Sequence, residues 1–169
     1  NEKSDNFYAE AILRTLGAIK GGGDGYPESI AAEMKAIKAL GIDTGTGIKI
    51  CDGSGLARMN YASPDFLVRY LKTMVYSDVF PDFIKSLPRP GEGTLGGMLG
   101  KLPADTRRRI HMKSGTMGGV RCFSGYILAR NGRPEDTIVF SFLTNNTVVA
   151  ASRMNFIIDK TVTLMAEQN

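Results

Sequence analysis

The sequence predicts an α+β protein in which helices pack against an antiparallel sheet. Two observations point to this class. Apolar residues recur at helical spacing in the first part of the chain, whereas short apolar runs separated by turn residues follow residue 109. One more helical pattern closes the sequence. Because helices come first, then consecutive strands, then a helix, we expect two layers rather than an alternating parallel sheet.

Capping signals define the first two helices. Ser4 or Asp5 can cap the first helix, which is predicted to end near Gly17. The second is predicted from about Pro27 to Leu40, since proline is well suited to the first helical position. The glycine-rich stretch between them is expected to be a loop.

A third helix is predicted over residues 63–74, and a short one over 80–87. The apolar residues of the third helix recur at helical spacing, which makes them core positions rather than a ligand site. They are Phe66, Leu67, Tyr70, Leu71 and Met74. Residues 48–51 form a short strand candidate between the second and third helices.

Three strands are predicted over residues 109–113, 122–130 and 137–144. The last two are joined by residues 131–134, where Asn-Gly signals a hairpin with a loop longer than two residues. The final helix is predicted over residues 148–167.

The composition is that of an ordinary globular domain and argues against nucleic-acid binding. The 169 residues correspond to about one domain, and 43% hydrophobic with 22% charged residues is ordinary for a globular protein. The formal charge of +4 is concentrated at residues 107–109, which we interpret as a solvated face beside a strand. Nucleic-acid binding is not expected, because basic clusters interleaved with aromatic residues are lacking. The chain begins at Asn1 rather than Met, so we expect a piece of a longer protein.

Cysteine and histidine residues do not form a metal site. Cys51 and Cys122 are far apart in sequence and could form one disulfide, although two buried thiols are the better interpretation. His111 is the only histidine and is expected to be a half-buried strand residue. No metal and no cofactor are therefore predicted.

The segment that could carry chemistry is Lys113-Ser114-Gly115-Thr116, on a predicted strand. Lys113 offers an ammonium to an anionic substrate, and Gly115 lets a substrate lie close to the backbone. Strand alternation places Ser114 and Thr116 on one face, and the Thr116 N–H could point at a developing oxyanion.

Two other glycine-containing segments fail as known motifs. Residues 52–56 have aspartate where a nucleophile elbow needs glycine, so we expect a tight turn. Gly91, Gly93 and Gly96 satisfy G-x-G-x-x-G, but prolines 88 and 90 are incompatible with the strand that a dinucleotide site requires before it.

Ser4-Asp5-Asn6 at a helix start and Lys113-Ser114-Gly115 on a strand together resemble the S-x-N and K-T/S-G elements of penicillin-binding proteins and class A β-lactamases. Further stretches narrow the resemblance to the D-alanyl-D-alanine carboxypeptidase/endopeptidase family typified by low-molecular-mass class C penicillin-binding proteins, the peptidase S13 type. In chain order the matching stretches are KSDNFYAE (3–10), DGSGLARMN (52–60), SLP (86–88), GTL (93–95), KSGTM (113–117) and SGY (124–126).

This resemblance implies roles for the motif residues. The Ser4 hydroxyl would belong to the proton-transfer network, and the Asn6 amide would position the substrate and Lys113, which supplies positive charge. Ser114 and Thr116 would bind the terminal carboxylate of the substrate, and the Thr116 N–H would complete the oxyanion hole. The sheet and helices would then be part of a penicillin-binding-protein/β-lactamase-like transpeptidase fold.

No serine in the chain has a lysine three residues later, so the S-x-x-K motif that carries the nucleophile is absent. Residues 1–169 are therefore expected to be the C-terminal part of the acylating domain, without the N-terminal part that bears the nucleophile. The isolated piece should be inactive. It should also expose a sheet edge and an apolar face, and so self-associate or be marginally stable.

The resemblance implies a serine-type D-Ala-D-Ala carboxypeptidase or endopeptidase that cleaves peptidoglycan stem peptides through an acyl-enzyme. Its partners would be stem peptides ending in D-Ala-D-Ala and β-lactams, and its location the periplasm or the outer bacterial surface. Two alternatives remain: a β-lactamase, which would need a deacylating water and its base, and a catalytically inactive peptidoglycan-binding homologue.

Overall fold

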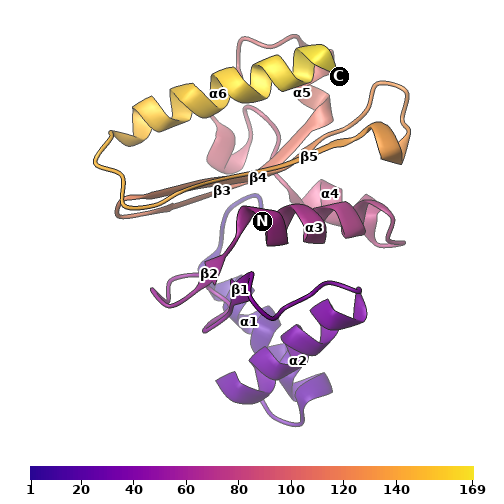
Figure 1. Ribbon diagram of the computed structural model, residues 1–169, viewed down its shortest axis with the longest axis vertical. Coiled ribbons are helices and arrows are strands. Elements are labelled where there is room, and N and C mark those ends of the chain that lie inside the picture. The colour runs from indigo at the N-terminus through magenta and orange to yellow at the C-terminus, as the bar shows by residue number, and fades with distance from the viewer. The chain divides into compact units, whose positions relative to one another are not determined.

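The computed structural model describes all of residues 1–169 and confirms the predicted α+β class (Figure 1). The chain divides into two compact units, one formed by Ser4–Tyr70 and one by Asn1–Lys3 with Leu71–Asn169. The helices and strands are α1 (Asn6–Leu16), α2 (Tyr26–Ala39), β1 (Ile48–Lys49), β2 (Tyr61–Ala62), α3 (Pro64–Val75), α4 (Phe80–Ser86), α5 (Ala104–Arg109), β3 (Ile110–Met117), β4 (Val120–Ile127), β5 (Ile138–Thr144) and α6 (Ala151–Gln168).

The unit Ser4–Tyr70 is mainly helical. Of the two predicted caps of α1, Asp5 is the one observed, because its carboxylate accepts a hydrogen bond from the Tyr8 backbone N–H at 3.1 Å. A π-helical turn, η1 (Gly17–Gly21), extends α1 beyond the predicted end, and Gly22 closes it with φ 84°. A small core then holds α2, the β1–β2 pair and α3 together, built on Ile37, Ile42 and Phe66.

The second unit contains a three-stranded antiparallel sheet in the order β3-β4-β5. Gly118 and Gly119 form the turn between β3 and β4, and Gly119 adopts φ 72°, which the missing side chain permits. The register places Lys113 opposite Ser124, which in turn lies opposite Ser141. These residues form one row across the sheet.

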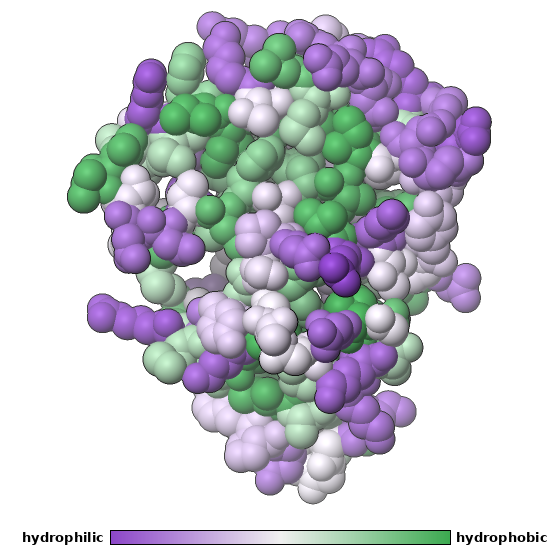
Figure 2. All heavy atoms as spheres, viewed as in Figure 1, coloured by the Kyte–Doolittle hydropathy of each residue, from purple (hydrophilic) through white to green (hydrophobic).

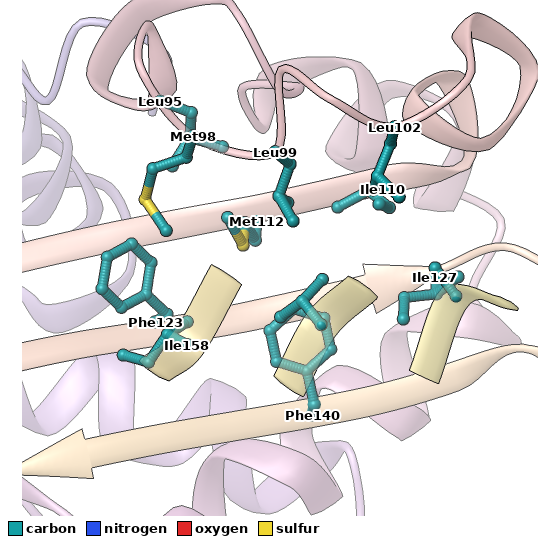
Figure 3. Packing of buried hydrophobic residues seen from close by; sticks show 12 residues of the cluster. Leu95, Met98, Leu99, Leu102, Ile110, Met112, Phe123, Ile127, Phe140 and Ile158 are labelled. Carbon is teal, nitrogen blue, oxygen red and sulfur yellow. The ribbon is translucent and has the colours of Figure 1, made fainter. Parts of the chain in front are cut away.

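One face of this sheet is apolar and covered by α6. Strand residues meet α6 and the loop between η2 (Gly93–Leu95) and α5 in a single buried cluster (Figure 3). Its members include Leu95, Met98, Leu99, Leu102, Ile110, Met112, Phe123, Ile127, Phe140, Ile158 and Val162. Burial of these side chains supplies the main stabilisation of the unit.

The opposite face of the sheet is in contact with α4. The ring of Tyr126 is fully buried, meets Phe80 and Phe83 edge-on, and donates its hydroxyl hydrogen to the Leu71 carbonyl at 2.8 Å. Both aromatic contacts have the T-shaped geometry that aromatic pairs favour. This fixes α4 against the end of the sheet that carries Tyr126.

Several predicted boundaries were wrong. Strand β3 begins at Ile110 and continues to Met117, because residues 104–109 form the short helix α5. Arg109 is not part of a solvated face: its guanidinium donates to the carbonyls of Leu128 and Ala166, at 2.9 and 3.0 Å. A charge run cannot reveal such carbonyl acceptors, because they come from distant residues.

Apolar side chains remain exposed on α6, where Phe156, Ile157 and Leu164 are 51%, 45% and 58% exposed. Hydrophobic atoms are also visible at the surface in the space-filling view (Figure 2). Strand β5 pairs only with β4, so its other edge is open. None of the helices combines the length and the hydrophobicity needed to span a bilayer.

Candidate active site

Strand β3 presents backbone donors along its outer edge. The Met112 N–H points away from β4 and donates to the Pro88 carbonyl at 3.1 Å. The backbone N–H groups of the even-numbered residues of β3 therefore point away from β4. The pairing with β4 continues without a bulge from Ile110 to Met117. Because backbone groups alternate along a strand, the N–H of Thr116 also points outward. Thr116 is exposed, so this donor can face a ligand.

Lys113 lies on the sheet face opposite to α6 and is half-buried. Its ammonium donates a hydrogen bond to the Ser114 carbonyl. Burial lowers the pKa of Lys113, because a charged ammonium loses hydration there. The neighbouring members of its row, Ser124 and Ser141, share a hydrogen bond of 2.8 Å between their hydroxyls. Lys113 therefore shares its row across the sheet with two hydroxyl-bearing residues.

Ser114 and Thr116 share a strand face, as the alternation predicts, but their environments differ. Ser114 is only 7% exposed, and its hydroxyl donates to Thr94 Oγ1 at 2.9 Å. Thr116 is exposed, because β3 extends beyond the apolar cluster after Ser114. Sequence reasoning singled out residues 93–95 as a matching stretch but assigned no role to Thr94. Only the fold brings this hydroxyl to Ser114.

Gly115 is not required by the protein's own packing. A Cβ built there would meet only Cys122 Cβ, at 3.7 Å, which is an ordinary van der Waals contact. Gly125 on β4 differs, because a Cβ there would lie 2.1 Å from the His111 carbonyl oxygen and 2.6 Å from Met112 Cα. The open space above exposed Gly115 is available to a ligand.

The S-x-N residues belong to the unit Ser4–Tyr70. Ser4 is exposed and adopts φ 54°, a left-handed conformation that non-glycine residues rarely adopt. Asp5 is occupied as the helix cap, and Asn6 is the exposed first residue of α1. Ser4 and Asn6 thus flank the cap, at the start of a helix.

The turn at residues 52–56 is held together by carboxylates. Asp52 accepts hydrogen bonds from the Ser54 hydroxyl at 2.7 Å, the Asn60 amide, and the backbone N–H groups of Gly55 and Ala57 at 3.0 Å. Burial alone would raise the pKa of Asp52, but these hydrogen bonds outweigh it and lower the pKa.

Glu10 of α1 binds the same turn, because its carboxylate accepts from the N–H groups of Gly53 and Ser54 at 2.8 and 3.2 Å. A Cβ at Gly53 would lie 2.7 Å from the Ala9 carbonyl oxygen, so only glycine allows this close approach. The predicted tight turn is confirmed, and its polar groups are used internally.

His111 is half-buried on β3, as predicted. Its Nδ1 lies 3.1 Å from the Ile84 carbonyl oxygen, and burial lowers its pKa. Cys51 and Cys122 are free thiols but are half-buried rather than buried. No three His, Cys, Asp or Glu side chains are grouped to hold a metal ion.

The model of the D-Ala-D-Ala carboxypeptidase 3 (S13) family matches residues 1–168. The chain belongs to this family. Its relatives include the penicillin-sensitive carboxypeptidase A of Dictyostelium discoideum, 32% identical over 97% of this chain and 32% of the relative. The D-alanyl-D-alanine carboxypeptidase of Actinomadura sp. is 31% identical over 84% of this chain and 26% of its own length. The chain thus spans about a third or less of these relatives.

The fold of this S13 chain is similar to that of solved penicillin-binding proteins. Penicillin-binding protein 4 of Haemophilus influenzae, in complex with a β-lactam, superposes with a TM-score of 0.75 at 22% identity. The superposition covers 90% of this chain and 35% of that protein. The predicted fold class and family are therefore confirmed.

Proposed function

We propose that this chain supplies the S-x-N and K-S-G parts of the active site of a serine-type D-Ala-D-Ala carboxypeptidase or endopeptidase. The observation that carries the proposal is the exposed end of β3, where an outward backbone N–H at Thr116 follows a glycine that packing does not require. Both features suit a strand on which a peptide substrate can lie.

The substrate would be a peptidoglycan stem peptide ending in D-Ala-D-Ala. A serine hydroxyl attacks the penultimate D-Ala carbonyl, a C–O bond forms, the C–N bond breaks, and the released D-Ala amine takes a proton. The Thr116 N–H would stabilise the oxyanion, and Lys113 would supply positive charge. Ser114 and Thr116 would contribute to binding of the terminal carboxylate, with Gly115 allowing close approach.

Ser4 and Asn6 would complete these functions from the start of α1. Ser4 would take part in proton transfer, and Asn6 would orient the substrate and Lys113. The exposure of both residues and the unusual φ of Ser4 support a functional role, since strained residues recur at active sites.

The nucleophile and its lysine would lie outside residues 1–169, because the chain contains no S-x-x-K. We infer that residues 1–169 are the C-terminal part of an acylating domain and do not hydrolyse peptides alone. The periplasm or the outer bacterial surface would be the site of action, where peptidoglycan is found.

Intact-mass spectrometry after incubation with benzylpenicillin tests the proposal. The complete protein and the 169-residue chain are treated in parallel, and we expect one penicilloyl adduct on the complete protein and none on the chain. A Lys113→Ala variant of the complete protein should acylate far more slowly, whereas Lys72→Ala, which alters an exposed lysine of α3, should not.

Two other outcomes would change the conclusion. The absence of an adduct on either form would favour a catalytically inactive peptidoglycan-binding homologue. An adduct that hydrolyses rapidly would favour a β-lactamase.

A further inference from the structure

The hydrogen bond that Ser114 forms determines whether its hydroxyl can bind an anion. A serine hydroxyl has one hydrogen to donate. Ser114 directs that hydrogen to Thr94 Oγ1, at 2.9 Å, and its side chain is buried. The hydroxyl therefore cannot donate to a carboxylate while this bond exists. The hydrogen of the Thr94 hydroxyl is not used in the bond to Ser114.

Thr94 is held in a fixed and exposed position. It lies in the short turn η2, between Gly93 and Leu95, and is itself exposed. Leu95 is fully buried in the apolar cluster, and its carbonyl accepts from the Gly91 N–H at 3.1 Å. Gly93 adopts φ 45°, and a Cβ there would lie 2.3 Å from the Glu2 carbonyl oxygen. The backbone on both sides of Thr94 is thus fixed by packing.

The carboxylate of Glu92 does not strongly repel an anion bound beside Thr94. Glu92 forms an ion pair with Arg89, in which Nη2 lies 2.6 Å from Oε1. The side-chain hydrogen bond to Arg89 lowers the pKa of Glu92, so the carboxylate stays ionised and paired. A ligand carboxylate beside Thr94 would therefore meet a neutralised pair rather than an isolated negative charge.

We propose that Thr94 is a further substrate-binding residue, whose hydroxyl donates to the ligand carboxylate, and that Ser114 is the residue that positions it. The proposal rests on the proposed function of the β3 strand and specifies how Ser114 takes part in it. Ser114 donates to Thr94, and Thr94 donates to the carboxylate of a D-Ala-terminated peptide or a β-lactam. Such a chain strengthens the outer bond, because each hydroxyl polarises the next.

Acylation of the complete protein by benzylpenicillin and by its methyl ester tests this role, since the ester lacks the carboxylate. Thr94→Val removes the hydroxyl at nearly constant volume, and Thr94→Ser retains it. We expect Thr94→Val to lower the second-order acylation rate constant for the free acid roughly tenfold or more, as for loss of a hydrogen bond to a charged group. The rate constant for the ester should change little.

Two further variants separate the roles. Ser114→Ala should reduce the preference for the acid by a smaller factor, and should add little when combined with Thr94→Val, because both act through one hydroxyl. Thr161→Val is the matched control, because this threonine lies on α6 and bonds its hydroxyl to the Ile157 carbonyl at 3.0 Å. Equal losses for acid and ester in Thr94→Val, or no loss, would overturn the proposal.

A binding measurement decides the matter without turnover. Acetyl-D-alanyl-D-alanine and its C-terminal amide are titrated into wild type and Thr94→Val by calorimetry. If Thr94→Val binds the acid more weakly but the amide equally well, the role of Thr94 is supported. This holds even if penicillin does not acylate the protein, an outcome that would contradict the proposed catalytic function but not the binding role. Equal affinity of the wild type for acid and amide, or no binding of either, would overturn it.

Discussion

Two glycine- and serine-containing segments of this chain look alike in sequence but serve different purposes. In the turn at residues 52–56, the Asp52 carboxylate accepts hydrogen bonds from side chains and backbone of the same turn, and Glu10 accepts two more. In the segment 113–116, Gly115 and Thr116 are exposed on a strand edge.

This contrast distinguishes a structural motif from a binding one. Where polar groups are saturated by their own neighbours and the glycine is required by contact, the motif stabilises the fold. Where a glycine is required by nothing in the chain and a backbone donor points outward, as at Gly115 and Thr116, that part of the motif is available to a ligand.

Removal of Asp52 should produce the largest effect on stability. Asp52→Ala leaves the N–H groups of Gly55 and Ala57 without their acceptor, so we expect a loss of about 2–4 kcal/mol in the free energy of unfolding. Urea unfolding measures it. Asp52→Asn keeps an acceptor oxygen and should lose less. Equal stability of Asp52→Ala and wild type would show that the turn is not structural.

Alanine at the two glycines should separate stability from binding. Gly53→Ala forces a Cβ within 2.7 Å of the Ala9 carbonyl oxygen and should cost about 1–3 kcal/mol. Gly115→Ala should alter the thermal midpoint little, but should slow acylation of the complete protein by benzylpenicillin. Calorimetry and acylation kinetics on both variants test this contrast, which fails if Gly115→Ala is the less stable of the two.

Low pH should destabilise the turn at residues 52–56. The pKa of Asp52 is lowered from its ordinary value of 3.8 and that of Glu10 from 4.5, because hydrogen bonds to the ionised forms outweigh burial. A lowered folded pKa means that the stabilisation is complete above the ordinary values and is lost as the pH falls below them. We expect the thermal midpoint to drop below about pH 4, and less steeply in Asp52→Asn. Identical slopes would argue against this origin.

High pH should affect the segment 113–116, through deprotonation of Lys113. The lowered pKa of Lys113 means that its ammonium loses a proton at a pH below the ordinary 10.5. If positive charge there is needed, acylation of the complete protein should decline before that pH is reached. A pH–rate profile checks this, and Lys113→Arg, which stays charged, should not show the same decline. A decline centred at or above 10.5 would contradict the argument.

The smallest expected effect is weak self-association of the isolated chain. The open edge of β5 and the exposed apolar residues of α6 can both pair with another copy. Sedimentation velocity should show a concentration-dependent shift, reduced in Ile157→Lys. A sharp monomer at all concentrations would contradict the prediction.

The sequence predicted elements better than contacts. Periodicity and capping located α1, α2, α3 and the three sheet strands, because those signals are local. The sequence did not predict the turn at Gly118 and Gly119, because glycine is also common in loops. It also did not predict the short helix α5, because a run of arginines is also common on charged surfaces.

The candidate site shows the same limit. The placement of Lys113 on a strand follows from the sequence, but the continuation of β3 to Met117 and the exposure of Gly115 and Thr116 do not. The hydrogen bond between Ser114 and Thr94 does not, because it joins residues that only the path of the chain beside β3 brings together. Whether Ser4 and Asn6 act with Lys113 stays a prediction.

The burial of Tyr126 has a practical consequence for spectroscopy. The chain contains no tryptophan and six tyrosines, and Tyr126 is the fully buried one, held edge-on between Phe80 and Phe83. An immobilised ring in an asymmetric environment gives a circular dichroism signal in the near ultraviolet, whereas solvent-exposed tyrosines contribute little. The contribution of Tyr126 to that signal therefore reports the integrity of the sheet unit without any label, and its loss on heating can be followed separately from the far-ultraviolet signal of the helices.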